Sequence, residues 1–217
     1  MKRLITSISF IIIGLFSAHA QFLNAFGISG GLTLARQKWL FTPPEQSSFA
    51  QKKNFLFGFN GSVFAEFLED ENYRWISELE FNQKGCRDKT EGNFKNRLQY
   101  ISWNNYLKYK WEIYQGFPYF LAGPKLEYLF SQSLESPPLA ASFHHLHGSL
   151  DLGAGFEWIS FYPFKFFSEL HYNPDVYLKA YKTDYLVARN RAWEIRVGVK
   201  YQRSRKKESC NAPVYVK

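Results

Sequence analysis

The side chains best suited to chemistry begin with a cluster of histidines. His144, His145 and His147 stand close together, and Ser142 precedes them. A serine beside a histidine can act as nucleophile and base in acyl transfer, and grouped histidines can bind zinc. No Gly-x-Ser-x-Gly or His-Glu-x-x-His pattern accompanies them, and motif chemistry needs such a context. We therefore expect a solvated loop cluster, with no catalytic residue, no metal and no cofactor.

A second pattern is the alternation of charged with apolar residues, as in Glu78 and Glu80 beside Leu79 and Phe81. Residues two apart share one face of a β-strand, so the charges would line one inner surface. An ion path, acid/base carboxylates and a salt-bridged plug are the possible interpretations. An eight-stranded barrel is just wide enough for its own side chains, which favours the plug. The expected lumen charge network comprises Glu66, Arg74, Glu78, Glu80, Lys125, Glu127, Asp151, Glu157, Glu169, Glu194, Arg196 and Lys200, with Lys84 and His171 on the same face.

The elements that would carry these charges are β-strands, because period-two alternation recurs and helical periodicity is nowhere sustained. The expected strands cover 24–34, 55–68, 73–84, 97–111, 118–130, 146–158, 166–172 and 193–202. Short connections at 69–72, 112–116 and 159–164 alternate with long ones at 35–54, 86–96, 131–145 and 173–191. This pattern predicts an all-β fold, an eight-stranded antiparallel up-and-down transmembrane β-barrel with short periplasmic turns and long extracellular loops. A soluble β-sandwich or lipocalin-like barrel, with its apolar stripes inward, is the alternative.

Aromatic residues make up 19% of the chain, and many of them flank the three short connections. Transmembrane barrels carry girdles of such residues at both membrane interfaces. We therefore predict one girdle at the periplasmic rim. Its expected members are Tyr73, Trp75, Trp111, Tyr119, Trp158 and Tyr162.

The N-terminal segment has the features of an export signal. Lys2 and Arg3 precede an apolar run, and Ala18-His19-Ala20 is a small-residue cleavage site. After Gln21 no apolar stretch approaches the length of a transmembrane helix. The expected organisation is a cleavable signal peptide at 1–20, an outer-membrane β-barrel domain at 21–203 and a basic periplasmic tail at 204–217. The protein would then lie in the outer membrane of a Gram-negative bacterium.

The cysteines and the net charge limit the partners. Cys86 would open an extracellular loop and Cys210 would lie in the periplasmic tail, so we predict two free thiols, because a disulfide needs Cα atoms within about 7 Å. The net charge is +8, but cations interleave with carboxylates, which argues against nucleic acid. The expected partners are outer-membrane lipid and lipopolysaccharide, whose phosphate groups carry the opposite charge.

Short motifs on three expected strands support a family resemblance. They are Gly58-Phe59-Asn60-Gly61, Ser77-Glu78-Leu79-Glu80-Phe81 with Lys84-Gly85, and Pro118-Tyr119-Phe120-Leu121-Ala122-Gly123-Pro124. The mature chain resembles the PorT-type, porin-like outer-membrane β-barrel family of Bacteroidetes over nearly its whole length. The resemblance implies an outer-membrane barrel and, at a finer level, a part in protein secretion beside envelope or secretion-system proteins.

Three functions follow from these patterns. The leading hypothesis is a non-enzymatic outer-membrane barrel that serves as a structural or interaction module. The alternative is a narrow or gated solute pore, and a lipid-modifying barrel enzyme comes third. Conductance separates the second hypothesis from the first, and mass spectrometry of lipid A separates the third.

Overall fold

The computed structural model describes residues 23–41, 53–68, 70, 72–88, 94–114, 116–135, 144–158, 163–175, 181–182 and 186–203. Eight long strands contain most of them: β1 (Leu23–Phe41), β3 (Leu56–Phe67), β4 (Tyr73–Asp88), β5 (Lys95–Lys110), β6 (Gly116–Leu134), β7 (Leu146–Trp158), β8 (Phe164–Pro174) and β10 (Leu186–Gln202). The two-residue strands β2 (Lys53–Asn54) and β9 (Tyr181–Lys182) pair with β4 and β10. In this described part of the chain, no helix is long and apolar enough to cross a membrane.

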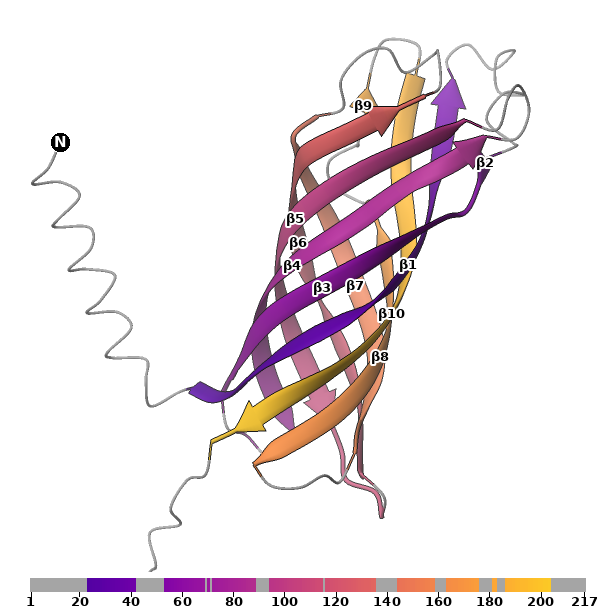
Figure 1. The fold of residues 1–217 in the computed structure, drawn as a ribbon. Helices are drawn as coiled ribbons and strands as arrows, with labels where there is room; N and C mark the ends of the chain where they lie inside the picture. The colour runs from indigo at the N-terminus through magenta and orange to yellow at the C-terminus, as the bar shows by residue number, and fades with distance from the viewer. Residues whose placement is uncertain are drawn as a thin grey trace, which may run out of the picture.

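The eight long strands close into a barrel. Each pairs antiparallel with its neighbours in the order β1-β3-β4-β5-β6-β7-β8-β10, and β10 pairs back onto β1. The closing seam runs from Ala25 opposite Gln202 to Phe41 opposite Leu186, and Figure 1 shows the resulting tilted cylinder. The predicted eight-stranded up-and-down barrel is confirmed, and the β-sandwich alternative is wrong.

The two ends of the barrel differ. At one end, here called the turn end, β1 begins and β10 finishes, and β3–β4, β5–β6 and β7–β8 are joined by the short connections (Figure 1). The opposite end is the loop end. At the β5–β6 turn, Ile113 and Gly116 exchange two backbone hydrogen bonds of 2.9 and 3.2 Å. Gly116 has φ +156°, and a Cβ there would lie 2.3 Å from the carbonyl oxygen of Glu157, so this tight turn requires glycine.

The barrel is apolar outside and polar inside. On β5, Ile101, Trp103 and Leu107 face outward and are 44–56% exposed, whereas Ser102 and Asn104 face inward and are buried. Water-soluble proteins place these residue types the other way round. The inward polarity also removes the lipocalin-like alternative, whose apolar stripes would fill the lumen.

Several strands extend further toward the loop end than the alternation predicts. β1 continues to Phe41 instead of ending at 34, β6 to Leu134 instead of 130, and β10 begins at Leu186 instead of 193. The backbone pairing continues there, but the alternation of polar with apolar residues stops, as at Arg36-Gln37-Lys38 opposite Arg189-Asn190-Arg191, so the period-two signal is lost. Cys86 is accordingly within β4 and buried, and the prediction that it opens a loop is wrong.

The expected signal peptide at 1–20 and the tail at 204–217 lie outside the described residues, as does Cys210. These assignments, and the absence of a disulfide, stay predictions.

Candidate functional site in the barrel lumen

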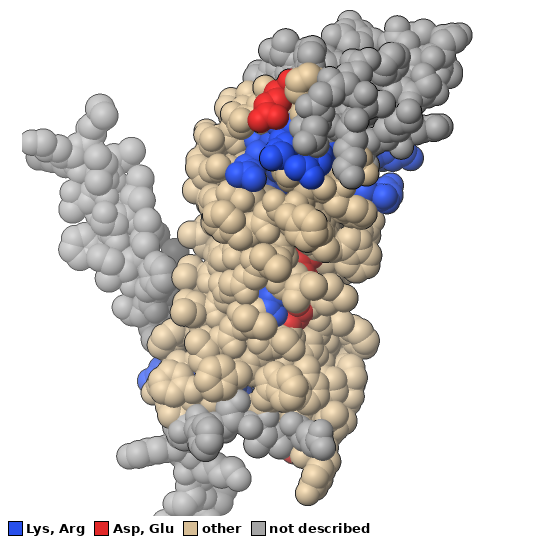
Figure 2. Space-filling view, turned by 45° about the vertical axis from the view of Figure 1, so that its right-hand side comes forward, with Lys and Arg blue, Asp and Glu red and all other residues tan. Residues whose placement is uncertain are grey.

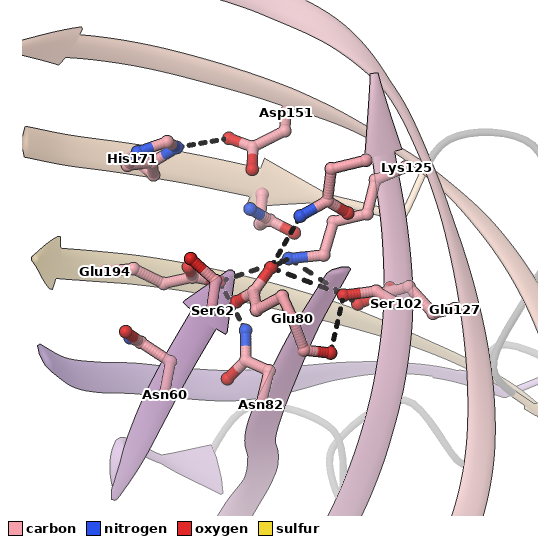
Figure 3. A network of polar contacts seen from close by, with 12 residues as sticks. Asn60, Ser62, Glu80, Asn82, Ser102, Lys125, Glu127, Asp151, His171 and Glu194 are labelled. Atoms are coloured by element: carbon pink, nitrogen blue, oxygen red, sulfur yellow. Dashed lines mark hydrogen bonds and ion pairs between the residues drawn. The ribbon is translucent and has the colours of Figure 1, made fainter. Parts of the chain in front are cut away.

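A central ion-pair cluster fills the lumen at mid-height. Arg196 on β10 lies 2.9 Å from Glu78 and 2.8 Å from Glu80, both on β4, and also pairs with Glu194. Lys125 on β6 lies 2.7 Å from Glu80 and 3.6 Å from Glu194. Figure 3 shows three of these side chains, Glu80, Lys125 and Glu194, reaching toward one another from different strands. All five residues are at most 5% exposed, so the charges compensate one another away from water.

Neutral amides and hydroxyls complete the coordination of this cluster. Asn104 donates to Glu78 at 2.8 Å and to Glu80 at 2.7 Å, and Ser62 donates to Glu78 at 3.0 Å. Buried carboxylates with further donors of this kind are more stable than bare ion pairs. The cluster is therefore a connected network across the barrel, in which strands far apart in sequence are tied together.

A second cluster lies toward the turn end. Lys108 pairs with Glu66 at 3.2 Å and with Glu157, while Lys200 pairs with Glu66 at 2.9 Å and Glu157 at 2.6 Å. Two cations thus share two carboxylates. The ammonium of Lys108 also lies 3.8 Å from the ring centroid of Tyr119. Each of the two lysines contacts both carboxylates, so the four charges compensate one another.

Apolar side chains separate these two clusters. Ile76, Tyr106, Tyr119 and Leu121 form a buried group inside the barrel, and Phe64 packs against it. The two tyrosine hydroxyls bond to carboxylates, Tyr106 to Asp151 at 2.7 Å and Tyr119 to Glu169 at 2.6 Å. The lumen is consequently layered, with an apolar layer between two charged ones.

His171 bridges two carboxylates beside the apolar layer. Its Nδ1 lies 3.1 Å from Asp151 and its Nε2 lies 3.0 Å from Glu169. Only the doubly protonated ring can donate at both nitrogens, so this geometry fits a charged imidazolium. His171 therefore belongs to the ion-pair network.

The loop-end part of the lumen is less completely paired. Lys84 binds Glu127 at 2.6 Å and Asn173 at 3.1 Å. In contrast, both ring nitrogens of His147 and one carboxylate oxygen of Asp175 are buried without a hydrogen-bond partner. Buried polar atoms of this kind are usually satisfied by ordered water.

A small cavity lies among these layers. A cavity of about 10 Å³ lies between the two main clusters, with Glu66 and Lys108 on one side and Glu78 and His171 on the other. That volume is about the size needed for one water molecule. The arrangement can hold charges in place and link strands across the lumen.

The structure brings almost the whole predicted charge network together. Every member is buried except Glu169, whose side chain is 9% exposed. Arg74 differs from the rest. It is buried and donates a 2.7 Å hydrogen bond to the carbonyl oxygen of Tyr73, but it forms no ion pair with a carboxylate of the described residues. Lys108 was missing from the predicted set, although its position two residues after Tyr106 on the inner face could have indicated it.

The structure describes five of the six residues that were expected in the aromatic girdle. Tyr73, Trp75 and Trp158 are exposed on the outer wall, and Trp111 lies between the rings of Tyr109 and Phe120, at centroid distances of 6.0 and 5.5 Å. The assignment of Tyr119 to this girdle is wrong, because Tyr119 is 1% exposed and points into the lumen. Side chains alternate between the two faces along β6, and Tyr119 occupies an inward position. This alternation determines its orientation, although a turn lies close by. Tyr162 lies outside the described residues.

The histidine cluster is divided by the barrel wall. His147 is in β7, fully buried in the lumen, and its ring packs edge-on against Tyr100. His145 stacks on the outward-facing Tyr128, and His144 is exposed. Among the described residues, no group of His, Cys, Asp and Glu side chains could hold a metal ion. The prediction that all three histidines lie in a solvated loop is wrong for His147, while Ser142 lies outside the described residues.

Comparisons with known proteins find likeness in fold. No family model matches the sequence, and no curated protein matches it. The crystal structure of Neisserial surface protein A has a TM-score of 0.51 at 15% sequence identity, covering 82% of this chain and 99% of that one. The outer membrane protein OprG from Pseudomonas aeruginosa has a TM-score of 0.57 at 13% identity, covering 84% and 98%. The chain therefore has the fold of the eight-stranded outer-membrane barrels.

Proposed function

We propose that the chain is an integral outer-membrane barrel of a Gram-negative bacterium. The support is its apolar outer wall, where Phe57 and Phe120 are 69% and 59% exposed, and its closed ring of strands, since open sheet edges do not occur in lipid. The shortest long strand, β8, has 11 residues, and about 9–11 tilted residues cross a bilayer. Short turns are periplasmic in such barrels, so the turn end would face the periplasm.

We further propose that this barrel is a sealed, non-enzymatic scaffold that presents its loop end for interaction. The observation that carries the proposal is the filled lumen, with two closed ion-pair clusters, an apolar layer and a cavity of about 10 Å³. Pores of this architecture need a water-filled interior. A lipid-modifying enzyme needs its nucleophile and base side by side. His145 and His147 lie on opposite sides of the barrel wall, which argues against that function.

Planar-bilayer recording tests the seal. The full chain should show no steady conductance, whereas an open porin in the same membrane does. Two neighbouring phenylalanines on β8 supply a matched pair, because Phe167 points inward at 5% exposed and Phe166 points outward at 53%. Phe167→Ala should add brief conductance events, and Phe166→Ala should not. Large steady conductance of the unmodified protein would support the pore instead.

The finer relationship to PorT-type secretion proteins is also a proposal. Its support is the resemblance of the motifs on β3, β4 and β6, such as Gly58-Phe59-Asn60-Gly61. Affinity capture of the tagged barrel from its native envelope should then recover subunits of a protein-secretion machine. Recovery of the intact barrel without them would leave the scaffold proposal standing and contradict the secretion role.

A further inference from the structure

The outer wall changes from apolar to cationic near the loop end of β1 and β10. Outward residues are apolar up to Trp193, and the next outward positions are Arg36 and Arg191, followed by Lys38 and Arg189. We call these four residues the loop-end cation cluster. Their side chains are exposed or half-exposed, so their charges are directed away from the lumen.

Like charges oppose one another in this cluster. Arg36 is the direct cross-strand partner of Arg191, and Lys38 is the partner of Arg189. Such pairs are destabilising in an antiparallel sheet. None of the four forms an ion pair with a carboxylate of the described residues, whereas Arg196 on the same strand contacts three. Among the described residues the cluster therefore has four cations and no carboxylate partner, an arrangement that suits an anion from outside the chain.

The position of the cluster indicates what kind of anion it would bind. The guanidinium of Arg36 lies 5.2 Å from the ring centroid of Phe55, at the upper edge of the apolar wall. Figure 2 shows Lys and Arg side chains near this end, with acidic atoms beside some of them, above a wall with few charged atoms. Lys95 and Arg97 on β5 are exposed at the same end of the barrel. In a bilayer that covers the apolar wall, these cations lie at headgroup level in the leaflet on the loop side.

We propose that the loop-end cation cluster binds the phosphate groups of lipid A, the phosphorylated glycolipid of the outer leaflet. Arginine forks bind phosphate oxygens bidentately, and two cation pairs stand about 7 Å apart along the strands, at about 3.4 Å per residue. The rigid β1–β10 seam holds them in place before the lipid arrives. This inference rests on the proposed outer-membrane location with the loop end outside.

The test uses the full chain, folded in neutral detergent micelles, and fluorescent lipid A that carries both phosphates. The double variant Arg36→Gln/Arg191→Gln should bind lipid A about 30-fold more weakly, since each cation near an anionic surface contributes on the order of 1 kcal/mol. The matched control is Lys110→Gln/Arg203→Gln, which removes two cations at the turn end and should bind like the unmodified chain. Dephosphorylated lipid A and phosphatidylglycerol complete the series, and both should bind weakly.

The outcomes separate this inference from the proposed function. Insertion of every variant into vesicles is measured first by protease resistance, and failure of the unmodified chain to insert would contradict the outer-membrane proposal. If the chain inserts but the Arg36→Gln/Arg191→Gln variant binds lipid A like the unmodified protein, the cluster is not the site. Equal binding of phosphatidylglycerol would show a general anionic surface and overturn the assignment to the glycolipid.

Discussion

Arg196 and Arg191 lie on the same strand, yet their surroundings are opposite. Arg196 points into the lumen, is fully buried, and contacts Glu78, Glu80 and Glu194. Arg191 points outward beside Arg36 and pairs with no carboxylate of the described residues. Arg196 is buried away from bulk solvent, so its charge needs a partner inside the barrel. Outside, solvent or lipid headgroups can supply the counter-charge, so the chain itself need not.

This difference assigns separate tasks to the two sets of charges. The inner set links β4, β6 and β10 across the lumen. The outer set repels itself across the seam and can contact an external anion. The charge balance of each face is thus more informative about function than the overall net charge of +8.

Removal of the inner guanidinium should have the largest effect. Arg196→Met leaves Glu78, Glu80 and Glu194 with less compensation, and breaking a buried ion pair on one side costs about 3–5 kcal/mol. Urea unfolding in neutral vesicles measures the loss. Arg191→Met is the matched control on the outer face and should change the free energy of unfolding by less than about 0.5 kcal/mol. Equal losses for the two variants would mean that the inner and outer environments do not differ in the way described.

The seam beside Arg196 should show an intermediate effect. Gly31 pairs with Arg196 across β1 and β10, and a Cβ there would lie 1.9 Å from the carbonyl oxygen of Ile195, whereas a Cβ on Gly30 would be 3.7 Å from its nearest neighbour. Gly31→Ala should therefore destabilise the barrel by about 1–3 kcal/mol. Gly30→Ala should be neutral or slightly stabilising. The same unfolding assay compares them, and a reversed order would show that the seam is not closely packed.

Removal of outer charges should have the smallest effect and the opposite sign. Lys38→Gln/Arg189→Gln relieves a like-charge pair, so the free energy of unfolding in neutral vesicles should rise by about 0.2–1 kcal/mol. The gain should vanish near 1 M salt, where the screening length is about 3 Å. A loss of stability at low salt would indicate that these cations have counter-charges within the chain, contrary to the proposed external anion.

The sequence by itself determined the number of strands, their order and the face on which most charges lie. Alternation such as Glu78–Leu79–Glu80–Phe81 has a period of two only in strands, and the lengths of the connections set the up-and-down topology. Glu66, Lys125 and Arg196 were assigned to the lumen by parity alone, and the structure buries all three. The same alternation along β6 would also have assigned Tyr119 to the lumen instead of the girdle.

Only the tertiary structure decided which charges meet, where the strands end and which charges have no partner. Glu66 and Lys200 are 134 residues apart, and closure of the barrel brings them together. The opposition of Arg36 to Arg191 depends on the register of the closing seam, which no local pattern specifies. The physical reason is that parity arises within one strand, whereas pairing, packing and burial depend on how all eight strands are aligned around the barrel.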